Sequence, residues 1–240
     1  MSTHVTQRAA VEPILAFDTA NQLGSVAVGT PGHVRVELTI GASARHAESL
    51  LPAIDLALRM ANVQRCALGA VIVGAGPGSF TGVRIAASTA KAIARALDLP
   101  LYAHSSLALL AAGAAAPGRA VCALFDARRA EVYAACYRFG SAGDTALRPC
   151  ADVILAPCVA RVEDVAGQLA PYDPVWVGEG ALRYADRIGR AGSFAPAALS
   201  VPRASSLLWL HAIDTQSSRV SDLAHWTPDY IRSPGAVRAS

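Results

Sequence analysis

The chain begins with short runs of apolar residues that are separated by polar turns. Three such runs cover residues 14–18, 24–28 and 33–40, and a Pro-Gly pair lies between the second and the third. Runs of this length with turn residues between them predict three strands joined by tight connections, an antiparallel meander.

The spacing of apolar residues then changes to that of helices. Apolar residues recur every three or four positions over residues 46–61 and again over residues 82–97. This spacing predicts two helices, with a buried strand at 71–73 between them. A short strand at 101–103 and a helix at 107–116 complete the first series of predicted elements.

The order of elements starts again in the second half of the chain. A strand predicted at 120–126 ends in Asp126, as the first strand ends in Asp18. The duplication indicates an α/β fold of two similar halves, each a mixed sheet flanked by helices. A loop-rich insertion is expected at 140–160. The other elements predicted here are strands at 131–138 and 175–177 and helices at 162–169 and 203–213.

The composition restricts the class of protein. Hydrophobic residues make up 53% and charged residues 16%, which excludes a disordered chain. The formal charge is only +3 and the arginines are scattered, so a basic stripe for nucleic acid is not visible. Five cysteines without a CxxC pair argue against a disulfide framework or a zinc site. No signal peptide and no apolar run of ~20 residues is found, so we expect a soluble, cytoplasmic protein.

Two tandem strand–turn–strand units that end in Asp resemble the actin-like ATPase superfamily, which has a ribonuclease H-like fold. In that superfamily the two halves hold a nucleotide between them, and glycine after the Asp lets backbone amides approach the phosphates. On this basis we expect a flexible N-terminus at 1–12, a partner-binding N-terminal actin-like domain at 13–104, a C-terminal actin-like domain at 105–216, and a tail at 217–240 that crosses back to the first domain.

A glycine-rich loop between a strand and a helix is the most informative stretch. It reads GAGPGSFTGVR over residues 74–84. Such a loop can hold phosphate on free backbone N–H groups, but the Lys-Ser or Lys-Thr of a Walker A loop and the GxGxxG spacing are both missing. A tight turn capped by Ser79 or Thr81 explains the loop at least as well, so both interpretations stay open at this point.

The same loop carries a closer resemblance. GPGSFTGVR with a downstream AKAIA, and DARRAEVYAA at 126–135, resemble two signatures of the TsaB (YeaZ) family. The opening ILAFDTA, RHAESLLP at 45–52, VGEGA at 177–181 and PDYIR at 228–232 follow the family's order as well. Together these motifs span residues 14–232, whereas any one of them alone would be a weak match.

The resemblance implies a chain without catalytic residues. The family's catalytic relative TsaD has a metal-binding His-x-x-x-His after the same loop and helix, and those positions fall on Ser106 and Leu110 here. A leucine cannot ligate a metal ion and a lone serine is a poor ligand. We therefore expect no metal site and no cofactor bound by this chain alone, with ATP or ADP and the metal on partner subunits.

The cleft between the halves is expected to be the remnant of a nucleotide site. The first hairpin reads Asp18-Thr19-Ala20, without the glycine of the kinase branch, and Arg128 stands in the glycine position after Asp126. An Arg128–phosphate contact and an ion pair of Arg128 with Glu131 are the alternatives there. The residues expected in this cleft are Asp18, Gly76, Gly78, Ser79, Asp126, Arg128 and Gly178.

A partner surface is expected on the two helices of the first half. Their small and aliphatic side chains must partly cover the sheet, and the resemblance implies that they also contact a partner in a helical bundle. In the family, TsaB pairs with TsaD through this half and can pair with itself when TsaD is absent. The residues expected at the interface are Leu50, Ile54, Leu58, Ile85, Ala86, Ala90 and Ile93.

The resemblance leads us to expect a non-catalytic scaffold for the formation of N6-threonylcarbamoyladenosine beside the anticodon of ANN-decoding tRNAs. Its partners would be the catalytic subunit TsaD and the ATPase TsaE, with only indirect contact to tRNA and none to a membrane. The alternative is an enzyme, either an ATP-dependent small-molecule kinase of the actin-like superfamily or a glycoprotease-like enzyme. A kinase needs intact phosphate hairpins and a protease needs a metal pair or a nucleophile, and we find neither in the sequence.

Overall fold

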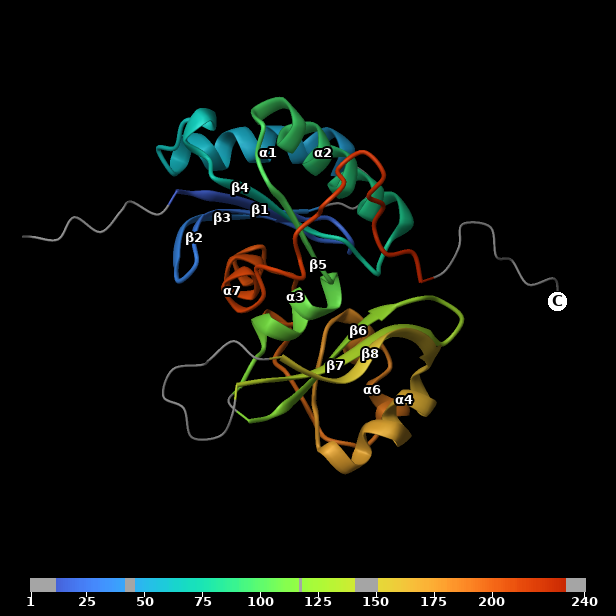
Figure 1. Cartoon of the computed structure of the whole chain (residues 1–240). Helices are drawn as coiled ribbons and strands as arrows, with labels where there is room; N and C mark the ends of the chain where they lie inside the picture. Colours follow the sequence, from blue (N-terminus) through green and yellow to red (C-terminus); the bar gives the residue numbers. More distant parts are fainter. Residues whose placement is uncertain (1–11, 42–45, 117, 141–150, 232–240) are drawn as a thin grey trace, which may run out of the picture.

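The computed structural model describes residues 12–41, 46–116, 118–140 and 151–231, and the statements below concern these residues. Two five-stranded sheets form the two halves of the molecule, with helices outside and between them (Figure 1). The layers therefore follow the order helix, sheet, helix, sheet, helix.

The first sheet has the strand order β3-β2-β1-β4-β5. Its first three strands form the antiparallel meander that the sequence predicts, and β4 and β5 run parallel to β1. The central strands β1 and β4 are buried along their whole length, in keeping with continuous apolar runs. The bounds are β1 (Ile14–Asp18), β2 (Gly24–Thr30), β3 (His33–Ile40), β4 (Ala70–Gly74) and β5 (Leu101–His104).

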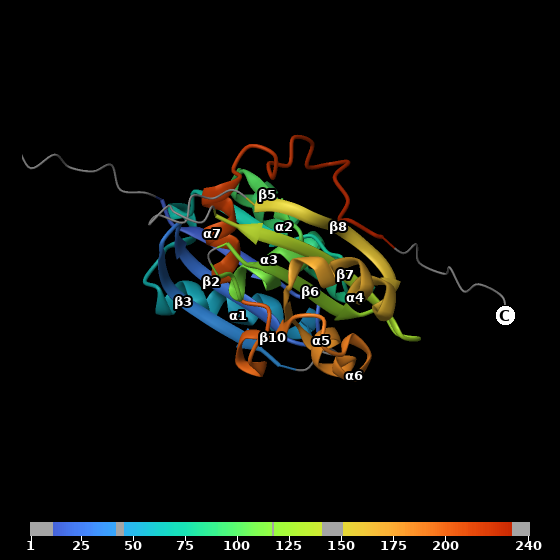
Figure 2. The ribbon, with the colours of Figure 1, turned by 90° about the horizontal axis from the view of Figure 1, so that it is seen from below.

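The second sheet repeats this topology, with the order β10-β9-β6-β7-β8. The equivalent of β3 is β8, which lies at the outer edge of the sheet (Figure 2). The loop-rich insertion predicted at 140–160 is wrong for residues 151–160, which belong to β8, and residues 141–150 lie outside the described part of the chain. The bounds are β6 (Ala120–Asp126), β7 (Glu131–Phe139), β8 (Ala151–Arg161), β9 (Val175–Val177) and β10 (Ser193–Phe194).

Helices cover the outer face of each sheet. On the first sheet α1 (His46–Met60) and α2 (Phe80–Leu97) bury their apolar sides against strand residues such as Phe17 and Val73. On the second sheet α4 (Val162–Leu169) covers the outer face, and the short helices α5 (Glu179–Arg183) and α6 (Ala185–Ile188) follow β9. None of the helices in the described part of the chain is long and apolar enough to span a membrane.

The two remaining helices lie between the sheets, and each packs on the sheet of the other half. The helix α3 (Ser106–Gly113) follows the first sheet but packs on β6 and β7 of the second. The helix α7 (Ser205–Ile213) follows the second sheet but packs on β1, β2 and β4 of the first. Their buried leucines join the inner faces of both sheets into one apolar cluster, so the two halves share a core.

The segment after α7 returns to the first half. Residues 217–231 run along the free edge of β5 and over the glycine loop (Figures 1 and 2). The N–H of Ala103 donates to the carbonyl of Ser218 at 2.8 Å, and the N–H of Val220 donates to that of Leu101 at 2.9 Å. Further along, the N–H of Asp229 donates to the carbonyl of Ala75 at 3.0 Å.

Candidate functional site

A polar cavity of about 630 Å³ opens between the two halves. Its walls are the β1–β2 turn, the glycine loop with the start of α2, the β6–β7 hairpin and α5. The walls include Gly78, Ser79, Asp126 and Arg128 of the residues expected from the sequence, and leave out Asp18, Gly76 and Gly178.

The glycine loop packs closely on the β1–β2 turn. The N–H of Ser79 donates to the carbonyl of Ala20 at 2.7 Å, and the hydroxyl of Thr19 donates to the carbonyl of Gly82 at 2.7 Å. A Cβ at Gly78 would lie 2.3 Å from the Ala20 carbonyl oxygen, and one at Gly82 would lie 1.9 Å from that of Thr19. The hydroxyl of Ser79 also caps α2 by accepting from the N–H of Gly82. The loop thus forms a tight turn capped by Ser79, which is one of the two interpretations that the sequence left open. The two glycines let the loop and the β1–β2 turn approach each other closely.

The carboxylate of Asp18 is fully buried at the end of β1. Its Oδ2 accepts a hydrogen bond of 2.5 Å from the hydroxyl of Ser106, and its Oδ1 accepts one of 2.9 Å from the N–H of Ala20. The Ser106 hydroxyl also accepts from the N–H of Gly76 at 3.1 Å. Asp18 therefore connects the first strand, the glycine loop and the start of α3 beneath the cavity wall.

The two positions that align with the metal-binding histidines of TsaD both lie inside the protein. Ser106 donates to Asp18, and Leu110 is fully buried in the core shared by the two sheets. Gly178 lies close to Leu110, since a Cβ at Gly178 would be 2.6 Å from the Leu110 Cδ2. Within the described residues, no three His, Cys, Asp or Glu side chains are grouped so that they could hold a metal ion.

The β6–β7 hairpin has an uncommon backbone at its tip. Arg128, Arg129 and Ala130 have φ values of 67°, 55° and 62°, in the left-handed region that residues other than glycine rarely adopt. The Oδ1 of Asp126 accepts from the N–H of Arg128 at 2.8 Å, which supports this tight turn. The arginine that replaces the kinase glycine is thus accommodated at a positive φ.

The carboxylate of Asp126 also joins the hairpin to α5. Its Oδ1 accepts from the hydroxyl of Tyr184 at 2.8 Å, and the guanidinium of Arg183 lies 3.6 Å from its Oδ2. Glu179, at the start of α5, accepts from the N–H of Asp126 at 3.3 Å. These contacts occupy both carboxylate oxygens of Asp126 from within its own half.

Glu179 connects the two halves across the cavity. Burial raises the pKa of its carboxyl above the ordinary value, and hydrogen bonds from the Asp126 N–H and the Asn21 side chain partly oppose this rise. Asn21 belongs to the β1–β2 turn of the first half, so this side-chain contact joins the two halves at the cavity. The motif VGEGA contains Glu179 between two glycines, but sequence reasoning selected only Gly178 from it.

Two backbone N–H groups of the glycine loop are already bonded within the protein. The N–H of Ser79 is bonded to Ala20, and the N–H of Gly76 is bonded to Ser106, so neither is free for a phosphate oxygen. The carboxylates of Asp126 and Glu179 and the guanidinium groups of Arg128 and Arg183 line the cavity, which therefore carries charges of both signs.

The outer surface of α1 and α2 is the second candidate region. Five of the seven residues expected at a partner interface are buried against the first sheet, and the other two, Ile85 and Ile93, are half-buried. The buried five are Leu50, Ile54, Leu58, Ala86 and Ala90, and of these Ile54 and Leu58 also line the groove between the two helices. Helical periodicity identified the apolar stripe but could not distinguish its sheet-facing side from its exposed margin.

An apolar groove of about 520 Å³ runs between α1 and α2. Its exposed rim includes Leu51, whose exposed fraction is 57%, and Ala96, and its floor includes Ile93 and Leu97. Leu51 is adjacent to Leu50, and two neighbouring leucines of one helix cannot both face the sheet. This pair of leucines is the signal in the sequence that could have indicated an exposed apolar groove.

Comparisons with known proteins agree with this architecture. A model of the family described as "TsaD: tRNA N6-adenosine threonylcarbamoyltransferase" matches residues 40–238. The TsaB protein of Bacillus subtilis is 29% identical over 223 residues, which are 91% of this chain and 93% of that protein. The TsaB protein of Escherichia coli is 37% identical over 127 residues, 53% of this chain and 54% of that protein. The chain belongs to the TsaB (YeaZ) family.

Solved structures of this family have the same fold. YeaZ from Pseudomonas aeruginosa is 30% identical and superimposes with a TM-score of 0.76 over 92% of this chain and 100% of that chain. A second structure, described as a Pseudomonas aeruginosa protein with similarity to peptidase YEAZ, superimposes with a TM-score of 0.77. The two mixed sheets of equal strand order are thus the actin-like, ribonuclease H-like fold expected from the sequence.

Proposed function

We propose that this member of the TsaB family is a non-catalytic subunit in the formation of N6-threonylcarbamoyladenosine on tRNA. Its role is to bind and stabilise the catalytic relative TsaD. The full names of the B. subtilis and E. coli relatives, "tRNA threonylcarbamoyladenosine biosynthesis protein TsaB", support the pathway. The cavity and the groove support this division of labour between the subunits.

The observation that carries this proposal is that the polar groups of the cavity are bonded to one another. Asp126 in the cavity wall is held by Tyr184 and Arg183, and Asp18, which lies beneath the wall, is held by Ser106. A general base needs a free oxygen within reach of substrate, and a phosphate site needs free N–H groups. Groups that are bonded in this way stabilise the contact between the two halves. Catalysis then belongs to a partner subunit.

The groove between α1 and α2 supports the binding role. An exposed apolar surface on paired helices suits a partner that offers a matching helix pair, because the two surfaces then exclude water together. TsaD resembles this chain through the same loop and helix, so it can present such a pair. A second copy of this chain can do the same when TsaD is absent.

The remaining components follow from this arrangement. ATP or ADP and the metal ion belong to the partner subunits TsaD and TsaE. The anticodon stem reaches TsaD and has only indirect contact with this chain, whose formal charge is +3. A kinase or glycoprotease activity of the isolated chain is the competing proposal.

Reconstitution tests the proposal. Purified TsaD and TsaE are supplied with threonylcarbamoyl-AMP, ATP, Mg²⁺ and a tRNA that reads ANN codons, with and without this chain. We expect transfer to require or to rise strongly with the chain, and none from the chain alone. Turnover by the chain alone, or stoichiometric binding of ATP–Mg²⁺ by it, would favour the enzyme alternative.

Matched charge variants test the surface. Leu51→Glu places a charge on the rim of the groove, and Leu182→Glu places one at an equally apolar, 44% exposed position on α5. Burying an unpaired carboxylate in an interface is costly, so Leu51→Glu should weaken co-elution with TsaD by about tenfold or more. Leu182→Glu should co-elute like the unchanged chain. Equal behaviour of the two variants would remove the groove from the interface.

A further inference from the structure

Two cysteines of the second half face each other across a pair of strands. Cys122 in β6 is the direct register partner of Cys136 in β7, and both are fully buried. Both side chains lie on the face of the sheet that α4 covers. The sequence separation of these residues gave no hint of the pairing, which comes from the hairpin register.

The backbone hydrogen bonds identify the kind of pair that the cysteines form. The N–H of Ala127 donates to the carbonyl of Glu131 at 2.9 Å, so these residues are a hydrogen-bonded pair at the hairpin end. Hydrogen-bonded and non-hydrogen-bonded pairs alternate along an antiparallel ladder. The ladder between β6 and β7 has no register shift, so counting back from this pair makes Cys122 and Cys136 a non-hydrogen-bonded pair.

This kind of pair brings side chains closest together. Its Cα atoms lie about 4.5 Å apart, against about 5.5 Å in a hydrogen-bonded pair. A disulfide needs a Cα separation of about 4.4–6.8 Å and Cβ atoms about 3.5–4.5 Å apart. The two thiols therefore stand where a bond between them requires little movement of the backbone.

We propose that Cys122 and Cys136 are a modification site, an oxidisable pair that closes to a disulfide across the β6–β7 hairpin. Hydrogen peroxide is the oxidant. The Cys136 sulfur attacks one peroxide oxygen, the O–O bond breaks, and a sulfenic acid and water form. The Cys122 sulfur then attacks the Cys136 sulfur, the S–S bond forms, and a second water leaves with the Cys122 proton. Two thiols are oxidised and one peroxide is reduced to two waters.

The environment gives the two thiols different roles. A hydrogen bond from the Cys122 thiol lowers the pKa of Cys136, while burial raises the pKa of Cys122. Cys136 therefore has the lower pKa of the two thiols, and we assign the first step to it. The half-buried Cys158 of β8 packs near the same cluster, but it lies opposite Ala134, two residues from Cys136 along β7.

The location of the pair links oxidation to the cavity. The same two strands lead to the hairpin tip, where Asp126 and Arg128 form one wall. A covalent bond between the strands limits the opening of this hairpin, and hence the movement of that wall against the glycine loop. The reduced form is the more mobile one.

Tryptic mapping tests the pair directly. The full-length chain is treated with peroxide under native conditions, its remaining thiols are alkylated in denaturant, and it is digested without reduction. Trypsin cuts after Arg119, Arg128, Arg129 and Arg138, which places Cys122 in peptide 120–128 and Cys136 in peptide 130–138. We expect these two peptides to appear as one disulfide-linked species that dithiothreitol separates. The oxidised chain should also melt at a higher temperature than the reduced chain.

The other cysteines supply the controls. Cys66, which is exposed, lies in a different peptide, and Cys158 lies in one that ends at Arg161 and also contains Cys150. The variant Cys122→Ala should lose both the linked species and the rise in melting temperature, and Cys158→Ala should keep both. Cross-links that involve only Cys66, Cys150 or Cys158, or sulfonic acid at Cys136 without any link to Cys122, would overturn the assignment.

Discussion

At the scale of single residues, two histidines stand out where β5 meets α7. The rings of His104 and His211 lie 6.5 Å apart, centroid to centroid. Nε2 of His104 and Nδ1 of His211 are buried without a hydrogen-bond partner among the described residues. Burial, together with repulsion from His211, lowers the pKa of His104 to about 4, although Asp214 acts in the opposite direction. His104 is thus neutral in the folded protein at any pH well above this value.

This histidine predicts a loss of stability in mild acid. The unfolded chain protonates His104 near pH 6.5, whereas the folded chain holds it neutral down to about pH 4. The stabilising contribution is therefore complete above pH 6.5 and declines as the pH falls toward 4. The shift corresponds to a free energy on the order of 3 kcal/mol.

Urea unfolding as a function of pH measures this contribution. The free energy of unfolding of His104→Leu should depend less steeply on pH than that of the unchanged chain over this interval. His225→Leu is the control, because the His225 side chain is 88% exposed. Equal slopes for the unchanged chain and His104→Leu would show that the buried ring does not resist protonation.

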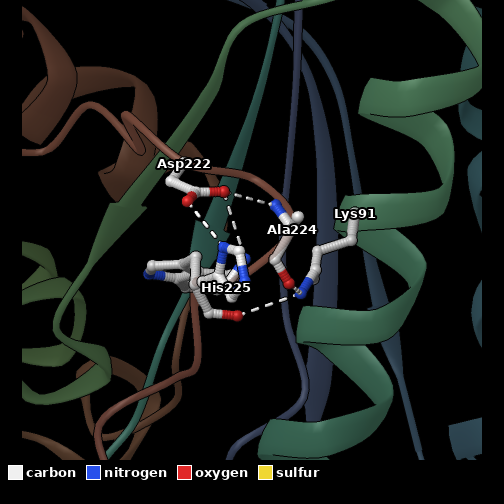
Figure 3. A network of polar contacts seen from close by, with 5 residues as sticks. Lys91, Asp222, Ala224 and His225 are labelled. Atoms are coloured by element: carbon white, nitrogen blue, oxygen red, sulfur yellow. Dashed lines mark hydrogen bonds and ion pairs between the residues drawn. The ribbon is translucent and has the colours of Figure 1, made fainter.

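At the scale of elements, the C-terminal segment is held by one unusual side chain. Lys91 on α2 is the only lysine among 21 basic residues. Its Nζ donates to the carbonyls of Ala224 and Trp226 at 3.1 and 3.0 Å, and Asp222 lies close by (Figure 3). A compact ammonium with three donors suits two converging carbonyls, whereas the planar fork of arginine does not. This geometry explains a lysine where the rest of the chain uses arginine.

Removal of this ammonium should loosen the segment. In Lys91→Met the N–H groups of Val220 and Asp229, which donate to the first half, should exchange with deuterium faster than in the unchanged chain. Lys91→Arg should give an intermediate exchange rate. Arg95→Met, on the exposed side of the same helix, should leave the exchange rate of these N–H groups unchanged. Unchanged protection at Val220 and Asp229 in Lys91→Met would mean that the edge of β5 alone holds the segment.

The sequence predicted elements well where burial is continuous along a strand or regular along a helix. Strands such as β1 and β6 are continuous apolar runs, and α2 has a regular apolar stripe, so period and turn residues identify them. The edge strand β8 carries Pro157 and is only partly buried, so its pattern resembled a loop. The short helix α5 has no complete helical period to detect, and its contacts with Asp126 depend on tertiary structure.

At the scale of the whole molecule, the exchange of α3 and α7 makes each half depend on the other. Leu110 of α3 belongs to the first series of elements but is buried against the second sheet, and Leu207 of α7 is in the converse position. Glu37 of β3 strengthens the joint, since it accepts from the N–H of Ser205 at 2.9 Å and pairs with Arg203. Repetition in the sequence indicated two similar halves, but this crossed packing could not be read from element order alone.

Because the inner face of each sheet is covered by a helix of the other series, the chain should unfold as one cooperative unit. Leu50→Ala tests this, because Leu50 lies on the outer side of the first sheet, in a different apolar cluster from the shared core. Deleting a buried leucine side chain costs about 3 kcal/mol. That loss should move the urea midpoints of deuterium exchange in peptides from β1 and from β6 by the same amount.

Val153→Ala at the exposed edge of β8 is the matched control and should move neither midpoint by much. If β6 peptides stay protected at urea concentrations where β1 peptides of Leu50→Ala have already exchanged, the second half is stable by itself. In that case α3 keeps the second sheet covered after the first sheet is lost, and the shared layer is a contact between two independent domains. Coincident midpoints would instead mean that the two sheets unfold together. Loss of α7 from the first sheet would then also open the second sheet.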